Sequence, residues 1–254
     1  MNKIGLILAQ NNEIKYLSDC LQNWISWREH NPLVIAVLDV CFQENSGGNS
    51  TDGSIQLLKQ YKHDNKIDFF EILPPGLKEH EARNVALKYL LDAGVEIVWL
   101  LGSDEIYSYE EINNAIKYVK KEEFITWFRI EFKNLVFDDK HYIKGFNPGR
   151  IFRTNQNKLK IKEMYYDDDF LYTDGINNID YKNLSHKQIP IHLCNPLHYT
   201  WLDDDRSKKK WEYQIKRWGK NGCSFFYENE KIVFNKEFYK KNNISLPEIY
   251  SILD

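Results

Sequence analysis

The chain has 254 residues, enough for one large α/β domain with a buried core. It carries 34 Lys plus Arg against 37 Asp plus Glu, and the resulting net charge of -3 argues against a histone-like or purely electrostatic DNA-binding protein. With 43% hydrophobic and 28% charged residues, the composition also excludes a disordered chain.

The cysteine spacing and the hydropathy pattern bear on the cellular compartment. The four cysteines form no C-x-x-C pair, and we expect free, buried thiols in a reducing compartment. No apolar stretch approaches the ~20 residues that span a bilayer. The apolar run near the N-terminus is shorter than the h-region of a signal peptide. We therefore expect a cytoplasmic protein without a transmembrane segment, whose association with a membrane, if any, is peripheral.

The first hundred residues alternate between two hydrophobic patterns. Nearly continuous apolar runs predict buried strands, and apolar residues three and four apart predict helices between them. In chain order the sequence predicts a strand at 4–9, a helix at 13–30, a strand at 34–38, a helix from 55, a strand at 67–73, a helix at 79–91 and a strand at 96–101. This alternation predicts parallel βαβ units, and hence a Rossmann-like, mostly parallel sheet flanked by helices.

The rest of the chain is less regular. Residues 124–132 alternate as in a half-exposed strand, residues 150–153 predict another strand, and residues 201–218 predict a basic helix that carries tryptophans. No repeat or linker divides the chain. We therefore expect a ligand-binding part at 1–200 and a C-terminal helical extension of the same domain at 201–254.

Ligands of such sheets bind outside the carboxyl ends of the strands. Neither a G-x-G-x-x-G fingerprint, a P-loop nor a G-x-S-x-G elbow is present. Carboxylates and amides follow the strands instead: Asn12 and Glu13, then Glu44, Asn45 and Asp52, then Asp104 and Glu105. Because Mg²⁺ and Mn²⁺ prefer carboxylate oxygen, this edge is predicted to bind a divalent cation and a ligand with hydroxyls and phosphates.

The order and spacing of these motifs resemble glycosyltransferase family 2, whose members have the GT-A fold, a nucleotide-sugar-binding α/β domain. The likeness covers roughly residues 1 to 200. It rests on Asn12-Glu13, Glu44-Asn45, Ser50-Thr51-Asp52-Gly53-Ser54, Ala82-Arg83-Asn84, Ser103-Asp104-Glu105, Gly149-Arg150-Ile151-Phe152-Arg153, Pro190-Ile191-His192 and His198-Tyr199.

The resemblance implies a metal-dependent, inverting glycosyltransferase that moves a sugar from a nucleotide-diphosphate donor to an acceptor hydroxyl. Asp104 and His198 would bind the Mn²⁺ or Mg²⁺ ion that stabilises the departing diphosphate. Contacts to the nucleotide sugar would come from Asn12, Glu44, Asn45, Asp52, Arg83, Asp104, Arg206 and Lys209. The general base for the acceptor would come from the acidic run at 167–169, with Asp168 and Asp169 as the candidates.

Two features depart from the family pattern. The acidic motif of the family is usually Asp-x-Asp, and this chain has Gly102 where the first aspartate would be. The ribose contact of that aspartate is therefore in doubt. The loop after the second strand is also longer than usual, because residues 46–49 lie inside a normally compact stretch.

Several of the candidate residues have structural alternatives. Asp52 is at a position typical of a helix N-cap, Arg83 can pair with Glu79 one helical turn earlier, and His198 can be a structural hydrogen-bonding residue. The basic cluster that contains Arg206 and Lys209 has the alternative of an exposed helix face.

Two other functions remain open at this stage. Nucleotidyl transfer uses a similar sheet, although residues 10–12 lack the glycine-rich basic loop of that class. The missing first aspartate also suggests a non-catalytic carbohydrate-binding domain. A carbohydrate, a lipid-linked or a protein acceptor is compatible with the sequence, whereas the net charge disfavours a nucleic acid.

Overall fold

The computed structural model describes residues 3–42, 47–154, 159–162, 169–173, 178–180, 184–202, 205–219, 222–228, 231–243 and 245–252. The chain divides into two compact units, which are described separately. Unit 1 comprises residues 1–131 and 147–195, and unit 2 comprises residues 132–146 and 196–254. The expected boundary after residue 200 falls inside unit 2, and the assignment of residues 201–254 to the same domain as the rest stays a prediction.

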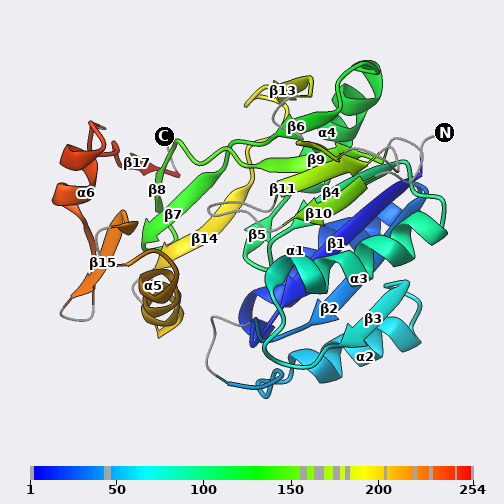
Figure 1. Ribbon diagram of the computed structural model, residues 1–254, viewed down its shortest axis with the longest axis horizontal. Helices are drawn as coiled ribbons and strands as arrows, with labels where there is room; N and C mark the ends of the chain where they lie inside the picture. Colours follow the sequence, from blue (N-terminus) through cyan, green and yellow to red (C-terminus); the bar gives the residue numbers. More distant parts are fainter. Residues whose placement is uncertain are drawn as a thin grey trace. The chain divides into compact units, whose positions relative to one another are not determined.

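Unit 1 contains the strand and helix alternation that the sequence predicts (Figure 1). Its elements are β1 (Ile4–Gln10), α1 (Ile14–Arg28), β2 (Leu33–Asp39), α2 (Ser54–His63), β3 (Phe69–Ile72), α3 (Glu79–Asp92), β4 (Ile97–Leu101), β5 (Glu105–Ile106), α4 (Tyr109–Lys121), β6 (Trp127–Arg129), β9 (Gly149–Arg153), β10 (Leu159–Lys162), β11 (Asp169–Thr173), β12 (Asn178–Asp180) and β13 (His186–Gln188).

A seven-stranded sheet, in the order β13-β6-β9-β4-β1-β2-β3, forms the centre of unit 1. β1 pairs in parallel with β2 and β4, and β2 pairs in parallel with β3. β9 is antiparallel to both of its neighbours, β4 and β6. The sheet is therefore mostly parallel, as predicted, and the carboxyl ends of β1, β2 and β4 lie at the same edge.

Helices cover both faces of this sheet. On one face α3 packs so closely that a Cβ atom on Gly5 of β1 would come within 2.7 Å of Leu90 Cδ1, which explains the glycine there. On the other face Trp24 of α1 contacts Trp99 of β4, with ring centroids 4.6 Å apart. Burial on both faces accounts for the nearly continuous apolar runs of β1, β2 and β4.

Two local expectations need correction in unit 1. The strand expected over 124–132 is confined to β6. Helix α4 was not predicted, although its N-terminus carries a capping box. Glu111 N donates to Ser108 Oγ at 3.2 Å, and Ser108 N donates to Glu111 Oε2 at 2.8 Å. The Ser-x-x-Glu spacing is a signal from which the helix could have been predicted.

Unit 2 combines a hairpin from the middle of the chain with the C-terminal segment. Its elements are β7 (Lys133–Phe137), β8 (His141–Ile143), β14 (Leu197–Leu202), α5 (Asp205–Trp218), β15 (Phe225–Glu228), β16 (Lys231–Phe234), α6 (Lys236–Lys241) and β17 (Tyr250–Ser251). β14 is parallel to β7, β8 is antiparallel to β7 and β17, and β15 and β16 form a hairpin. Val136, Ile143 and Phe225 form a small core.

The prediction of one helix over 201–218 is wrong at its start. Trp201 lies in β14, where it is the register partner of Val136 in β7. The helix begins at Asp205. The long-range pairing with β7 decides the conformation of residues 197–202, and nothing in their local pattern reveals that pairing.

Two expectations on composition can be compared with the structure. Cys20, Cys41, Cys194 and Cys223 are free and buried, as predicted. Within the described part of the chain, no helix is both long and apolar enough to cross a membrane.

Candidate functional site

The ends of β1 and β2 are joined by polar contacts around Asp39, whose side chain is fully buried. Asp39 Oδ1 accepts hydrogen bonds from Gln10 Nε2, at 2.5 Å, and from the Ser50 hydroxyl. Asp39 Oδ2 accepts a hydrogen bond from Ser50 N at 3.1 Å. Both oxygens of the buried carboxylate are thereby satisfied. These contacts fix the loop that follows β2 against the end of β1.

Gln10 leaves one buried atom at the carboxyl end of β1. Its side-chain oxygen Oε1 has no hydrogen-bond partner among the described residues, and Gln10 is 2% exposed. Flipping the amide would turn this oxygen toward the Asp39 carboxylate, where two acceptors would repel each other. The amide of Gln10 is therefore oriented by its contact with Asp39, and Gln10 helps to fix the end of β1 against the end of β2.

Asn12 holds the loop after β1 to the loop after β2. Its backbone is left-handed, with φ of 55°, which asparagine tolerates better than most residues. Asn12 N donates to Ser50 Oγ at 2.7 Å, and Asn12 Oδ1 accepts from Thr51 N at 2.9 Å. Asn12 therefore shapes the edge of the sheet where a ligand is expected, and its contact with a nucleotide stays a prediction.

Asp52 joins the N-termini of two helices. Asp52 Oδ2 accepts from Ile14 N, the first residue of α1, at 2.8 Å. Asp52 Oδ1 accepts from Ser54 N, the first residue of α2, at 3.0 Å. Partial burial alone would raise the pKa of Asp52, but the hydrogen bonds from Ile14 and Ser54 outweigh it and lower the pKa. The N-cap residue of α2 is Gly53, so Asp52 is not the N-cap itself, but from the preceding position it accepts hydrogen bonds from the first residues of both helices. A nucleotide contact of Asp52 stays a prediction.

Replacing Asp52 with alanine is expected to cost about 1 kcal/mol of folding free energy at neutral pH, the usual cost of losing a side chain that caps a helix. A lowered folded-state pKa stabilises the fold above the ordinary aspartate pKa of about 3.9, and this stabilisation is lost as the pH falls through the folded-state pKa. Urea unfolding of wild type and Asp52→Ala from pH 7 to pH 3 measures this difference in folding free energy. The difference should shrink in acid, and a difference that does not depend on pH would contradict the assignment.

A tight turn follows β4 at the same edge of the sheet and carries Asp104. Glu105 N donates to Gly102 O at 3.2 Å, which closes the turn over residues 102–105. Asp104 is 7% exposed and Glu105 is 1% exposed. Two carboxylates thus lie in succession at the carboxyl end of a buried strand, where ligands of parallel sheets bind.

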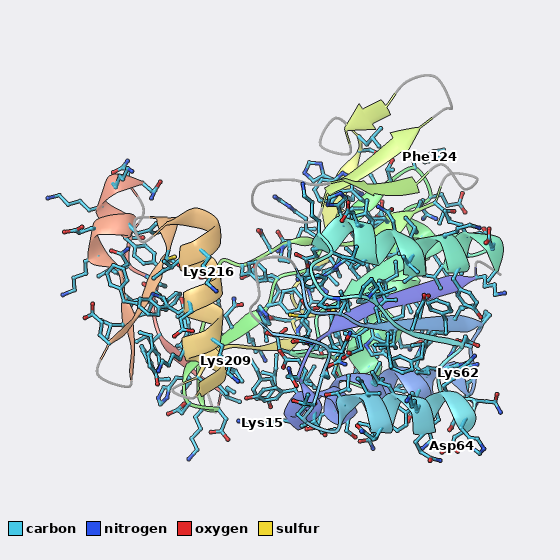
Figure 2. All side chains as sticks on the ribbon, turned by 60° about the horizontal axis from the view of Figure 1, so that its bottom comes forward. Lys15, Lys62, Asp64, Phe124, Lys209 and Lys216 are labelled. Carbon is cyan, nitrogen blue, oxygen red and sulfur yellow. The ribbon has the colours of Figure 1, made fainter. Side chains whose placement is uncertain are left out.

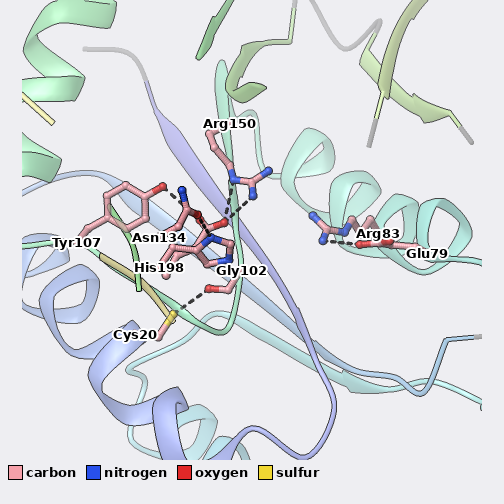
Figure 3. A network of polar contacts seen from close by, with 9 residues as sticks. Cys20, Glu79, Arg83, Gly102, Tyr107, Asn134, Arg150 and His198 are labelled. Carbon is pink, nitrogen blue, oxygen red and sulfur yellow. Dashed lines mark hydrogen bonds and ion pairs between the residues drawn. The ribbon is translucent and has the colours of Figure 1, made fainter. Parts of the chain in front are cut away.

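Glu105 is paired with an arginine from the neighbouring strand β9 (Figure 3). Arg150 donates to Glu105 Oε1 from Nε at 3.0 Å and from Nη2 at 2.6 Å. The Tyr107 hydroxyl donates to Glu105 Oε2 at 3.2 Å. Burial raises the pKa of Tyr107 well above its usual value, and the charge of Glu105 raises it further. Both oxygens of Glu105 are therefore engaged by neighbouring side chains.

Cys20 of α1 contacts this turn, and the carboxylates around it affect the pKa of its thiol. Its thiol donates to Gly102 O at 3.3 Å. Burial raises the pKa of Cys20 well above its usual value, and the charges of Glu105, Asp104 and Glu13 raise it further, in that order. The carboxylates of Glu13, which follows β1, and of Asp104 and Glu105, which follow β4, thus lie near one buried thiol. That the strand-end residues form one ligand site stays a prediction.

The motif at 82–84 lies within α3. Arg83 forms an ion pair with Glu79, with Nη2 and Oε1 2.7 Å apart. This is the structural alternative that the sequence offered, and a nucleotide contact of Arg83 stays a prediction. Asn84 Nδ2 donates to Ile161 O at 2.8 Å, and Asn84 Oδ1 accepts from Ile161 N at 3.0 Å. Asn84 thereby attaches β10 to α3.

His198 lies in unit 2, on β14. Its Nδ1 is 2.8 Å from Asn134 Oδ1 on the neighbouring strand β7, and because an amide oxygen only accepts, Nδ1 donates this hydrogen bond. The ring stacks on Phe146 and packs against Phe132, with centroids 5.3 and 5.5 Å apart. A ring oriented through its other nitrogen is the usual state of a metal-binding histidine, but metal binding by His198 stays a prediction.

The basic candidates lie on α5 of unit 2. Lys209 is exposed and projects from this helix, as does Lys216 (Figure 2). Arg206 is in the first turn of α5, and its side chain is outside the described part of the chain. Lys209 lies on an exposed helix face, which is the structural alternative for the basic cluster. Diphosphate contacts of Arg206 and Lys209 stay predictions.

Four of the candidate site residues lie wholly or partly outside the part of the chain that the structure describes. Glu44, Asn45 and Asp168 are not among the described residues. Asp169 opens β11, and its side chain is likewise outside the description. The prediction that residue 168 or 169 is the general base, and that residue 44 or 45 reads the nucleobase, stays untested.

The described residues contain no group of three or more His, Cys, Asp or Glu side chains arranged to hold an ion. Mg²⁺ is usually bound by one or two carboxylates together with the phosphates of a substrate. Asp104 is nearly buried at the strand end, and metal binding by Asp104 stays a prediction.

Comparisons with known proteins extend to the fold only. No family model matches the sequence, and no curated protein matches it. The mannosyltransferase PcManGT from Pyrobaculum calidifontis, in complex with GDP-Man and Mn2+, is similar over 97% of this chain and 66% of its own length, with a TM-score of 0.52 and 12% identity. TarS 1-349 from S. aureus is similar over 64% of this chain, with a TM-score of 0.46 and 21% identity.

The likeness to PcManGT confirms the fold class. The chain has a mixed α/β fold, with a large, mostly parallel sheet between helices, and this fold is similar to that of the mannosyltransferase. The chain spans 51% of the length of TarS 1-349. At these identities the comparisons define a fold and no individual site residue.

Sequence reasoning missed three residues that the structure places at the strand ends. Gln10 and Asp39 are the last residues of β1 and β2, and Arg150 lies beside the end of β4. Polar residues that end otherwise apolar strands were a usable signal for the first two. Arg150 belonged to a motif that the sequence analysis quoted, but nothing in the sequence indicates its pairing with Glu105, 45 residues earlier.

Proposed function

We propose that this protein is a glycosyltransferase that transfers a sugar from a nucleotide-diphosphate donor to an acceptor hydroxyl. The observation that carries the proposal is the turn at Asp104, a nearly buried carboxylate that follows β4 at the carboxyl edge of a parallel sheet. The fold adds support, because the mannosyltransferase with the similar fold is itself in complex with GDP-Man and Mn2+.

The proposed donor site lies along the ends of β1, β2 and β4. Asp104 would hold a divalent cation, Mn²⁺ or Mg²⁺, together with the diphosphate. When bound, such an ion stabilises the charge that develops on the departing diphosphate. We keep Asp168 or Asp169 as the general base and inversion as the outcome, both by resemblance; the acceptor is a carbohydrate, lipid-linked or protein hydroxyl.

The proposal predicts that a nucleoside diphosphate with Mn²⁺ raises the melting temperature, Tm. Ligand at 100 times its Kd adds about 2.7 kcal/mol of stability, which corresponds to a rise of roughly 5–10 °C for a chain of this size. Asp104→Asn should abolish the rise because it removes the carboxylate charge. A thermal-shift panel of UDP, GDP and their sugars, with and without Mn²⁺, measures it.

Asp92→Asn is the matched control, because Asp92 is an exposed carboxylate at the end of α3 that pairs with Lys88 on the surface. It should keep the full rise in Tm. A panel in which no nucleotide changes the Tm of the wild type would refute the proposal. Release of nucleoside diphosphate from a bound nucleotide sugar separates the transferase from a binding domain, which would give the Tm shift without release.

A further inference from the structure

We propose that the ion pair of Glu105 and Arg150 is the positioning device of the Asp104 turn, and that Glu105 fills the space that an aspartate at position 102 would need. Arg150 is then a positioning residue for donor binding, rather than a group that touches the donor. The inference rests on the proposed function, because it assigns to Asp104 the contact with the metal and diphosphate.

Both carboxylates of the turn fold back over Gly102. A Cβ atom on Gly102 would lie 2.9 Å from Glu105 Oε1 and 3.0 Å from Asp104 Oδ1. No side chain can therefore be added at position 102 unless one of these oxygens moves. The chain keeps two acidic residues at the end of β4, but the second of them is residue 105.

The carboxylates of Asp104 and Glu105 are both buried in this turn, and two such charges close together repel each other unless a cation compensates for one of them. Arg150 provides that cation. Its Nε and Nη2 atoms both donate to the one oxygen, Oε1, that overlies Gly102. The side chain of Arg150 is 16% exposed and that of Glu105 is 1% exposed, so the pair is largely shielded from water.

The arginine is held by the sheet itself. β9 is antiparallel to β4 with Ile151 opposite Trp99, so Arg150 enters the sheet beside the last residues of β4. A planar guanidinium that binds through two N–H groups fixes both the distance and the direction of its partner. Glu105 is thereby anchored to a neighbouring strand, and Asp104, the residue before it, is held in a defined orientation.

This arrangement separates the roles of the two acidic residues. Arg150 and Tyr107 engage Glu105 from two sides, at 2.6 and 3.2 Å. Glu105 is therefore the anchor of the turn, and Asp104 is the carboxylate that we assign to the metal and diphosphate. Loss of Arg150 would leave Glu105 buried without its cation and would release the turn from β9.

The test is a comparison of Arg150→Met with the double variant Glu105→Gln and Arg150→Met. Two quantities are measured: the Tm without ligand, and the Kd of UDP and of GDP at saturating Mn²⁺ by calorimetry below the Tm. Arg150→Met should lower the Tm and weaken nucleotide binding at least tenfold. The double variant removes the unpaired charge, so its Tm should recover, but its nucleotide binding should stay at least tenfold weaker because the turn is no longer anchored.

Arg153→Met is the matched control on the same strand. Arg153 donates to the carbonyl oxygens of Ile125 and Val119, away from the turn, so its loss should lower the Tm and leave the Kd unchanged. Wild-type affinity in Arg150→Met, or affinity that returns with stability in the double variant, would overturn the positioning role and leave the proposed function standing. No binding by the wild type would overturn both.

Discussion

Replacing Gly102 with aspartate, which restores the Asp-x-Asp spacing, is expected to destabilise the protein and weaken nucleotide binding. The new Cβ atom would lie 2.9 Å from Glu105 Oε1 and 3.0 Å from Asp104 Oδ1. A flexible side chain would move aside easily, but Glu105 is held by Arg150 at 2.6 Å. The added carboxylate also brings a third negative charge to the turn. The substitution therefore opposes both the packing and the charge balance of the site.

The alanine variant gives a lower bound for the folding free energy that Gly102→Asp loses. Gly102→Ala adds one methyl group and should cost about 1–3 kcal/mol of folding free energy, as overpacking usually does. Gly102→Asp should cost more, because like charges are added to the overpacking. Urea unfolding measures both variants, and calorimetry with UDP or GDP and Mn²⁺ measures binding.

Gly48→Ala is the control for the loss of a glycine, since a Cβ atom at Gly48 would meet nothing within 4 Å. It should change the free energy of unfolding by less than about 0.5 kcal/mol, as surface substitutions do. A Gly102→Asp variant with the stability of the wild type and tighter nucleotide binding would contradict the proposal that Glu105 fills the space at position 102.

The central sheet was predictable because its strands are buried on both faces. Ile4–Gln10, Leu33–Asp39 and Ile97–Leu101 are buried along their whole length, and a buried strand between helical patterns has a recognisable sequence. The helices between them were predictable from their apolar spacing. The position of β9 between β4 and β6 was not, because strand order depends on contacts between distant segments.

The candidate site was predictable only in outline. Asp104 could be predicted because the end of a parallel strand is where ligands bind. The partners of its neighbour could not: Glu105 meets Arg150 through the pairing of β9 with β4, which is a property of the fold. Gln10 and Asp39 lie one residue beyond the strands predicted at 4–9 and 34–38, and their polar contact becomes visible only when the register of β1 and β2 brings the two residues opposite each other.

Trp24, Trp99 and Tyr107 form an aromatic cluster near the Asp104 turn. Removing a ring from this cluster is expected to have a large effect on stability. Trp24 is fully buried, and its ring centroid lies 4.6 Å from that of Trp99 and 5.7 Å from that of Tyr107, both in edge-on geometry. Trp24→Ala should cost about 3–5 kcal/mol, as large-to-small aromatic substitutions in cores do. For a chain of this size that lowers the Tm by roughly 6–20 °C.

The substitution should also affect binding, because Tyr107 donates to Glu105 and a cavity beside Tyr107 would loosen that contact. Calorimetry with Mn²⁺ and UDP or GDP below the lowered Tm measures this. Trp24→Phe should be much milder. It keeps an aromatic ring in the cluster, and the indole Nε1 that it removes is buried without a hydrogen-bond partner among the described residues.

Phe124→Ala is the control for losing an aromatic ring outside the core, since Phe124 is 93% exposed. Its position is labelled in Figure 2. It should leave both stability and binding unchanged. If Trp24→Ala and Phe124→Ala were equally stable, the cluster would not be a packed support for the turn. If Trp24→Ala lost stability but bound the nucleotide as the wild type does, the turn would be held by Arg150 and the backbone alone, and the aromatic cluster would serve only the core.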